Sequence, residues 1–417
     1  MKKVIYITVV LLLSSVFIQA QTTREEFFSD SRHAAGIYQP YIYADTPVTP
    51  PPRGYKPFYI SHYGRHGSRW LSTADPYINP DKILGEAHAA GKLTPLGESL
   101  YERVAIAAED AFNRYGDLSE LGVAEHRDIA ERMFSSYPEV FSTRKGRECN
   151  IYSRSTNVPR CILSMAANNE RLKELNPEIK MTREATARNS YLNNPYGPSD
   201  RDSLNTVTRI FLEENFDTED FISRVFTDNE YAAELVASPM SFINDLYAIA
   251  SDLHNIPHLD FTMSDVFTQE ELFILWQASN FKRYYYFTGQ EARDSTKLLL
   301  RNILDCAVKA IEGNNISADL RFGHDTYVSP LVALMDINGP FRQEPDIEKV
   351  YTAWSDFKVT PMGANLQLIF FRNDRTGDVI VKVLHCEKEV VIPVETDIPP
   401  FYHWRDFRAY YEAKLAR

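Results

Sequence analysis

Two arginines flank a single histidine within the five residues Arg65-His66-Gly67-Ser68-Arg69. Guanidinium groups suit phosphate, because their planar fork donates two parallel hydrogen bonds to its oxygens. A neutral imidazole nitrogen held between them can attack phosphorus and carry a covalent phosphoryl group. The segment follows a short apolar run, residues 58–60, and its glycines allow a tight turn. The pattern therefore indicates either a phosphate site with a nucleophilic histidine or an exposed polar turn with incidental charge.

Two further segments place polar side chains just after predicted strands. Arg160 stands at the predicted start of a helix, 158–167, and a helix start attracts anions through its free N–H groups. The pair His324-Asp325 follows an apolar strand, 318–323, and precedes another helix. A histidine there can donate to a phosphate oxygen, and the neighbouring carboxylic acid can protonate a departing alkoxide and then deprotonate water. Taken alone, Arg160 would be interpreted as a surface arginine, and the His-Asp dipeptide as one that occurs by chance in a chain of this length.

The elements that must position these residues form an α/β pattern. Strands alternate with helices at both ends of the chain, and a helix-rich block separates them. We predict an α/β core of residues 21–165 and 316–417, interrupted by an α-helical insert domain of residues 166–315. The two strand ends that carry Arg and His would meet at the carboxyl edge of the core sheet, where ligands of open α/β sheets bind.

Local signals predict several individual elements. Thr94 and Pro95 are suited to the cap and first position of a helix. Helical periodicity covers 268–283 and 291–311, and alternating apolar residues predict a hairpin of 365–372 and 378–384.

Charge restricts the class of partner. The 417 residues include 45 Lys and Arg against 57 Asp and Glu, a formal net charge of −12. Such a balance argues against a broad nucleic-acid surface, so an anionic substrate needs cations concentrated in one pocket. The basic segment 180–188 is either a source of such cations for additional phosphates or a solvated turn.

The first twenty residues have the composition of a secretory signal peptide. Lys2 and Lys3 precede an apolar stretch, 4–18, and Ala20 marks a cleavage site. The alternative is an uncleaved anchor, although the stretch is shorter than the ~20 residues of a spanning helix. We therefore expect a periplasmic or secreted protein with no membrane span after cleavage. An exported chain permits disulfides, and the four cysteines are either bridged or buried free thiols: Cys149, Cys161, Cys306 and Cys386.

Together these motifs resemble the histidine acid phosphatase family, the phytase-like branch of the histidine phosphatase superfamily. The Arg-His-Gly-x-Arg motif is residues 65–69, and the Leu-Thr-x-x-Gly element is residues 93–97. Arg160 begins an Arg-Cys-x-x-Ser segment, and the late His-Asp is His324-Asp325. The resemblance implies a phosphoglycerate-mutase-like α/β sandwich with an inserted α-helical domain, and members of the family are often exported.

The resemblance also implies roles for the motif residues. His66 would be the nucleophile that forms a phosphohistidine, and Asp325 the proton donor to the leaving oxygen. The residues that would bind the phosphoryl oxygens are Arg65, Arg69, Arg160 and His324. The chemistry would require no metal or other cofactor. Its substrate would be a small anionic phosphomonoester, with inositol polyphosphates such as phytate first among named candidates and sugar phosphates or bisphosphoglycerate next.

The chain departs from the family pattern in two places. Trp70-Leu71 stands where a proline usually follows the second motif arginine. The acid lies in His-Asp, as in phytases and general acid phosphatases, whereas multiple inositol polyphosphate phosphatases typically carry His-Ala-Glu. A non-catalytic phosphate-binding protein and a phosphoglycerate-mutase-like enzyme are the other interpretations. The presence of both His66 and Asp325 argues against the first, and the export signal against the second.

Overall fold

The computed structural model of the chain describes residues 22–192, 201–339 and 343–417. The predicted signal peptide, residues 1–20, lies outside the described residues. No helix within the described ranges combines the length and apolar character needed to cross a bilayer.

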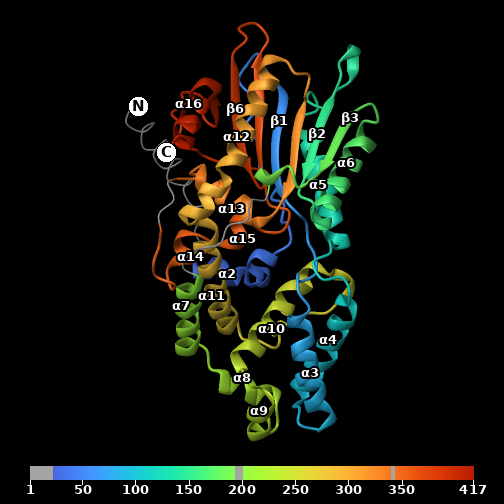
Figure 1. Cartoon of the computed structure of the whole chain (residues 1–417), viewed down its shortest axis with the longest axis vertical. Helices are drawn as coiled ribbons and strands as arrows, with labels where there is room; N and C mark the ends of the chain where they lie inside the picture. Colours follow the sequence, from blue (N-terminus) through green and yellow to red (C-terminus); the bar gives the residue numbers. More distant parts are fainter. Residues whose placement is uncertain (1–21, 193–200, 340–342) are drawn as a thin grey trace, which may run out of the picture.

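The described residues build one mixed sheet of eight strands, seen in the upper half of Figure 1. Its order is β3-β2-β4-β1-β5-β6-β7, and β8 pairs with β6. The strands β3, β2, β4 and β1 run parallel, whereas β5 is antiparallel to β1 and β6 is antiparallel to β5. The strand bounds are β1 (Tyr55–Arg65), β2 (Asn150–Ser155), β3 (Lys180–Ala185), β4 (Ala318–Gly323), β5 (Asn365–Asn373), β6 (Val379–His385), β7 (Lys388–Glu389) and β8 (Phe401–His403).

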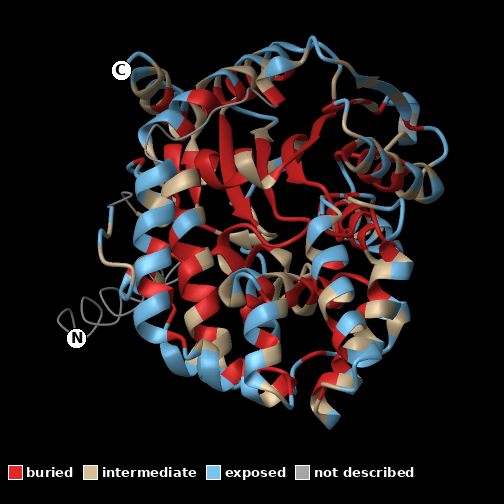
Figure 2. Cartoon of the chain, turned by 60° about the horizontal axis from the view of Figure 1, so that its bottom comes forward, coloured by how far each residue is buried: buried red, intermediate tan, exposed pale blue. Residues whose placement is uncertain are grey.

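Helices cover both faces of this sheet, which makes a three-layer sandwich. One face packs on α12 (Gln290–Glu312), α13 (Asp325–Leu334) and α16 (Trp404–Leu415). The other face packs on α5 (Glu120–Ser136) and α6 (Pro159–Leu175). Figure 2 shows the strands buried between helices whose outer faces are exposed.

Alternation of apolar side chains explains why the strands are buried on both faces. In β5, Leu368 and Phe370 pack on the α12 side, whereas Ile369 and Phe371 pack on the α5 side. Successive side chains of a strand point to opposite faces, so each residue has a separate hydrophobic layer. The predicted hairpin is confirmed as β5 and β6, joined by a turn that contains Gly377 in the left-handed region.

A helical lobe forms the lower half of Figure 1, at the carboxyl ends of the parallel strands. One hydrophobic cluster holds it together, and residues of two separate stretches of the chain contribute to it. The lobe helices are α3 (Asp75–Ala89), α4 (Pro95–Ala111), α7 (Arg201–Asn215), α8 (Thr218–Val225), α9 (Asn229–Leu235), α10 (Pro239–Asp252) and α11 (Gln269–Thr288). Between lobe and sheet lie α2 (Arg24–Ser29), α14 (Val350–Ala353) and α15 (Asp356–Val359).

Short 3₁₀ turns complete the described chain. They are η2 (Ser31–Tyr38), η3 (Arg144–Gly146), η4 (Ser190–Leu192), η5 (Leu253–Asn255) and η6 (Pro257–Leu259).

The limits of this lobe differ from the predicted insert, 166–315. Within that range, β3 pairs with β2 as a strand of the sheet, and α12 packs on a sheet face. Outside that range, α3 and α4 belong to the lobe, because their apolar residues pack against α8 and α10. Hydrophobic periodicity shows that a helix has a buried face but does not show which neighbour covers it.

The predicted helix starts agree with the structure. The Thr94 hydroxyl accepts a hydrogen bond from the Gly97 N–H at 3.1 Å, and Pro95 is the first residue of α4. The same hydroxyl donates to the carbonyl of Arg224 at 2.6 Å, so the cap also joins α4 to α8. Thr268 caps α11 through a capping box with Glu271.

Candidate active site

His66 lies immediately after β1, at the edge of the sheet that faces the helical lobe. Its N–H donates to the carbonyl of Gly323, the last residue of β4, at 2.9 Å. Its carbonyl accepts from Gly363 N–H at 3.0 Å, just before β5 begins. Two neighbouring strands therefore fix the backbone of His66, and its side chain is 1% exposed.

The hydrogen bonds of the imidazole leave one nitrogen free. Nδ1 lies 2.9 Å from the carbonyl oxygen of Gly67. Because a carbonyl only accepts, Nδ1 carries the proton and Nε2 keeps its lone pair. Burial, followed by the positive charges of Arg65 and Arg69, holds the pKa of His66 well below its ordinary value of 6.5. The hydrogen bond and the low pKa therefore both favour a neutral imidazole whose Nε2 carries a lone pair.

The loop after His66 packs directly against the start of α5. A methyl group at Gly67 would lie 2.5 Å from the carbonyl oxygen of Gly122, and one at Gly122 would lie 2.2 Å from that of Ser68. Only glycine fits at both positions. The buried Glu125 carboxylate accepts from the Ser68 N–H at 2.7 Å, from the Ser68 hydroxyl at 2.8 Å and from the Tyr41 N–H at 2.8 Å. Glu125 thus holds the loop that joins the two motif arginines.

Arg65 is fully buried and only half satisfied. Its Nη1 donates to the carbonyls of Ile37 and Thr360, both at 2.6 Å. Its Nη2 lies 3.6 Å from Asp325 Oδ2, and neither Nη2 nor Nε has a hydrogen-bond partner among the described residues. Burial lowers the pKa of Arg65 to about 10, so the group stays charged. The Nε and Nη2 edge is the one that bidentate binding of an oxyanion uses.

Arg69 and Arg160 supply further cations from different elements. Arg69 donates from Nη1 to the Trp70 carbonyl at 2.6 Å and lies over the ring of Tyr38 at 5.4 Å. Arg160 is half-buried in the first turn of α6. The Nε of each has no hydrogen-bond partner within the described chain. Both charges contribute to the lowered pKa of His66.

His324 lies between β4 and α13, and Asp325 is the first residue of α13. The rings of His324 and His66 are 5.7 Å apart, centroid to centroid, at 73°. His324 Nε2 lies 3.3 Å from the Thr156 hydroxyl, and burial lowers the pKa of His324 to about 4. Burial alone would raise the pKa of Asp325, but the charges of Arg65 and Arg283 outweigh it and leave that pKa at about 2.

The structure thus brings together every residue that the sequence analysis assigned to the site. They come from the end of β1, the start of α6 and the end of β4, and they gather because β2, β4 and β1 are parallel neighbours. Ligand sites of open α/β sheets form at this edge.

Arg283 is the residue that the sequence analysis missed. It lies on α11 in the helical lobe, half-buried, and its charge lowers the pKa values of both Asp325 and Arg65. No hydrogen bond or ion pair joins it to another described residue, although its guanidinium lies 5.9 Å from the Phe287 ring. Its sequence context is an ordinary helix, so only the packing of the lobe shows that it faces the site.

The basic segment 180–188 is not the turn that the sequence analysis considered. Lys180–Ala185 forms β3, an exposed edge strand, and Lys180 pairs with Glu148. Because β3 is parallel to β2, the exposed Arg188 follows it at the same edge of the sheet as the site. All four cysteines are unpaired. Within the described ranges, no group of three or more His, Cys, Asp or Glu side chains has the arrangement of a metal site.

Comparison with known proteins shows the fold. No model of a known protein family matches the chain, and neither does any curated protein sequence. Among solved structures, the chain resembles the multiple inositol polyphosphate phosphatase of Bifidobacterium longum in complex with inositol hexasulfate. That match has a TM-score of 0.75 and 18% identity, and it covers 92% of this chain and 98% of that chain.

Two further solved structures are similar to the chain in fold. The phytase from D. castellii matches with a TM-score of 0.66 and 17% identity over 92% of this chain and 85% of that chain. The apo form of Hafnia alvei phytase matches with a TM-score of 0.52 and 12% identity over 88% of this chain and 98% of that chain. These matches confirm the fold implied by the resemblance to the histidine acid phosphatase family.

The Glu125 contacts generate the first prediction. In Glu125→Gln, the amide NH₂ would oppose one of the three donors that the carboxylate now accepts. We expect the free energy of unfolding to fall by about 1.5–3 kcal/mol, because a hydrogen bond to a charged group is lost. Urea unfolding would measure this loss. Glu174→Gln, which alters an exposed ion-paired carboxylate, is the matched control, and equal stabilities of the two variants would contradict the role of Glu125.

Proposed function

We propose that this protein is an exported phosphatase that hydrolyses phosphomonoesters through a phosphohistidine. The observation that carries the proposal is the neutral His66, with Nε2 free, among the guanidinium groups of Arg65, Arg69 and Arg160. Such a site binds a phosphoryl group by charge and presents a nucleophile to its phosphorus atom. The predicted signal peptide supports export.

The first half of the reaction transfers the phosphoryl group to the enzyme. The open edges of the arginines bind the phosphoryl oxygens, and Nε2 of His66 attacks phosphorus in line with the ester oxygen. The P–O bond to the alcohol breaks, and Asp325 gives its proton to the departing oxygen. The free alcohol and a phosphorylated His66 result. In the second half, the Asp325 carboxylate takes a proton from water, which attacks the phosphorus and releases inorganic phosphate and neutral His66.

The charge balance explains how Asp325 can act as an acid. Without ligand, Arg65 and Arg283 hold its pKa at about 2. A bound phosphate brings negative charge to the same arginines, which offsets their effect on Asp325 and raises its pKa. Substrate binding thus favours the protonated form of Asp325, which is the form that donates a proton.

Inositol polyphosphates are the substrate class that we propose. The B. longum structure holds inositol hexasulfate, a cyclitol that carries an anion on each ring carbon. Arg283 extends the cationic surface from the sheet edge onto the helical lobe, where a second phosphate of such a substrate would lie. The alternative, a general sugar-phosphate or bisphosphoglycerate phosphatase, would use the arginines of the core without needing Arg283.

The nucleophile is tested by trapping the intermediate. We expect His66→Ala to lose at least 10³-fold in kcat, because the covalent route disappears. Rapid acid-free quenching of the wild-type enzyme with ³²P-labelled ester should yield one labelled histidine, located by peptide mass spectrometry. His258→Ala, which removes an exposed histidine paired with Asp110, should label normally. Unchanged turnover in His66→Ala would reject the mechanism.

The proton donor is tested by varying the leaving group. We expect Asp325→Asn to lower kcat/KM for alkyl phosphates such as glucose 6-phosphate by about 10³-fold, within the range of general acid catalysis. The kcat/KM for p-nitrophenyl phosphate should fall much less, because its phenolate departs without a proton. Dephosphorylation, which both esters share, should slow as well, so a burst of p-nitrophenolate should precede its steady state. Equal losses of kcat/KM for the two esters would contradict a role of Asp325 in protonating the leaving group.

The substrate class is tested through Arg283. We expect Arg283→Met to raise KM for phytate about tenfold while leaving KM for p-nitrophenyl phosphate within twofold, because only the larger substrate spans both halves of the site. Phosphate release at varied substrate concentration measures both constants. Arg405→Met, an exposed arginine on α16, serves as the charge-matched control. A parallel rise for both substrates would favour the general phosphatase.

A further inference from the structure

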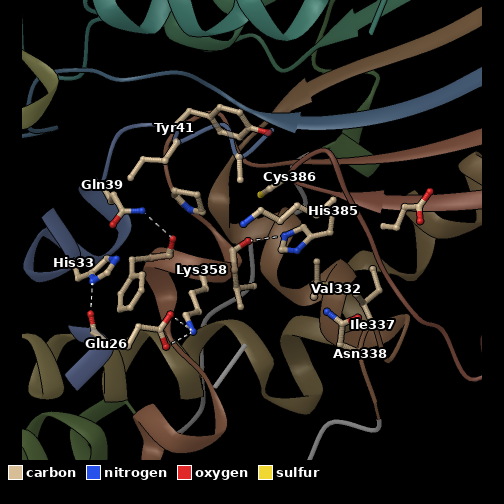
Figure 3. Close-up of a pocket in the computed structure, with 17 residues that line it drawn as sticks. Glu26, His33, Gln39, Tyr41, Val332, Ile337, Asn338, Lys358, His385 and Cys386 are labelled. Atoms are coloured by element: carbon tan, nitrogen blue, oxygen red, sulfur yellow. Dashed lines mark hydrogen bonds and ion pairs between the residues drawn. The ribbon is translucent and has the colours of Figure 1, made fainter. Parts of the chain in front are cut away.

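A second cavity of about 600 Å³ lies beside the active site, at the carboxyl end of β6 (Figure 3). None of the residues assigned to catalysis lines it. We call it the lateral cavity. Its apolar walls come from α13, α15 and the segments around residues 42 and 361. The polar and charged residues that line it are Glu26, His33, Gln39, Asn338, Lys358, His385, Lys388 and Glu389. Its volume is that of a site for a small organic ligand.

The backbone segments that bind Arg65 also border the lateral cavity. Ile37 and Thr360 supply the carbonyls that hold Nη1 of Arg65, each at 2.6 Å. Gln39, Val359 and Pro361 stand within two residues of those carbonyls and line the cavity. The Met362 N–H donates to the Gln39 carbonyl at 2.9 Å, which joins the two segments. A ligand that displaced this backbone would displace the acceptors of Arg65.

Two buried side chains that line the cavity each carry an acceptor with no hydrogen-bond donor among the described residues. Gln39 is 5% exposed; its Nε2 donates to the Phe357 carbonyl at 3.3 Å, but its Oε1 has no partner among the described residues. His385 is 7% exposed, and its Nε2 donates to the Val359 carbonyl at 2.8 Å, which leaves Nδ1 as an acceptor. Figure 3 shows both side chains at the cavity. Unpaired buried acceptors are costly, and a ligand N–H or O–H would satisfy them.

One of the charged residues that line the cavity, Lys388, has no partner of opposite charge among the described residues. Glu26 pairs with Lys358 at 2.7 Å, and Glu389 pairs with the buried Lys382 at 2.7 Å. Lys388 has no ion pair with another described residue, so it contributes one uncompensated positive charge. Because both carboxylates are already paired, the one remaining ammonium group matches a monoanion better than a phosphate dianion. The charge pattern thus distinguishes this cavity from the active site, where several guanidinium groups gather.

The position of Lys388 is set by a constrained turn. Cys386 and Glu387, between β6 and β7, both have left-handed backbone angles, with φ of 47° and 63°. Non-glycine residues adopt such angles only where the surroundings enforce them. Here Glu387 accepts from Arg132 Nη2 at 2.8 Å and from the Tyr41 hydroxyl at 2.8 Å. Tyr41 also lines the cavity, so the turn and the cavity wall are joined.

We propose that the lateral cavity binds a small amphipathic carboxylate that carries an N–H donor, of the class of N-acylated hydrophobic amino acids, and that its binding adjusts Arg65. The carboxylate pairs with Lys388, the N–H donates to Gln39 Oε1, and the aliphatic side chain contacts the apolar wall that includes Val332, Ile337 and Phe357. The binding step stands on the cavity alone, whereas its effect on activity rests on the proposed phosphatase function.

Calorimetric titration with N-acetyl-L-leucine tests the binding step on the full chain carrying His66→Ala, so the result is independent of phosphatase activity. We expect saturable binding of one molecule per chain and at least tenfold weaker binding of N-acetyl-L-leucinamide, which lacks the carboxylate. Lys388→Met should weaken binding of the acid about tenfold and leave binding of the amide unchanged. Lys56→Met removes a lysine at the opposite end of β1 and should have no effect. Gln39→Leu should weaken binding of both compounds, because both carry the N–H group.

Each result decides one part of the proposal. Absence of saturable binding, or binding that Lys388→Met and Gln39→Leu leave unchanged, overturns the site. For the coupling, wild-type enzyme saturated with N-acetyl-L-leucine should change KM for p-nitrophenyl phosphate at least twofold, and Lys388→Met should abolish that change at the same concentration. Binding without any change in KM overturns the coupling and keeps the site. If the wild-type enzyme has no phosphatase activity even without the ligand, the proposed phosphatase function is contradicted. The calorimetric result on the cavity is independent of that outcome.

Discussion

The concentration of positive charge around one neutral imidazole is the constraint on which the structure depends. Burying guanidinium groups next to one another is unfavourable unless their N–H groups are satisfied. Arg65 meets this demand through the carbonyls of Ile37 and Thr360, and Asp325 lies within 3.6 Å. The Nε and Nη2 edge of Arg65 has no hydrogen-bond partner among the described residues, which suits it to an oxyanion. Burial and the same positive field hold the pKa of His66 below its ordinary value.

The rest of the molecule maintains this arrangement from three directions. Parallel pairing of β1 with β4 sets His66 beside His324, and Glu125 holds the loop that follows. The helical lobe supplies Arg283 on α11, which is anchored to the core where Trp276 donates to the buried Asp356 carboxylate at 3.0 Å. Burial raises the pKa of Asp356 to about 6.

Much of this could be predicted from local signals. The strand before His324 was predicted with its correct limits, 318–323, and the β5–β6 hairpin follows from alternation and a turn glycine. Other features depend on long-range packing. The segment that became β3 is short, polar and exposed, so it lacks the apolar alternation of a strand. The helices α3 and α4 precede the predicted insert, yet they complete its core, because amphipathic faces pair by shape and not by order in the chain.

The sequence by itself determined the chemistry: a histidine between arginines, a later arginine at a helix start, and a His-Asp pair after an apolar strand. These are local patterns, and the reactivity of their side chains follows from residue type. Only the tertiary structure decided which charges converge, that Nδ1 of His66 is held by the Gly67 carbonyl, and that Arg283 completes the cationic surface from the lobe. The physical reason is that fields and hydrogen bonds act through space. Residues more than 200 positions apart share one site because parallel strands bring their ends to the same edge.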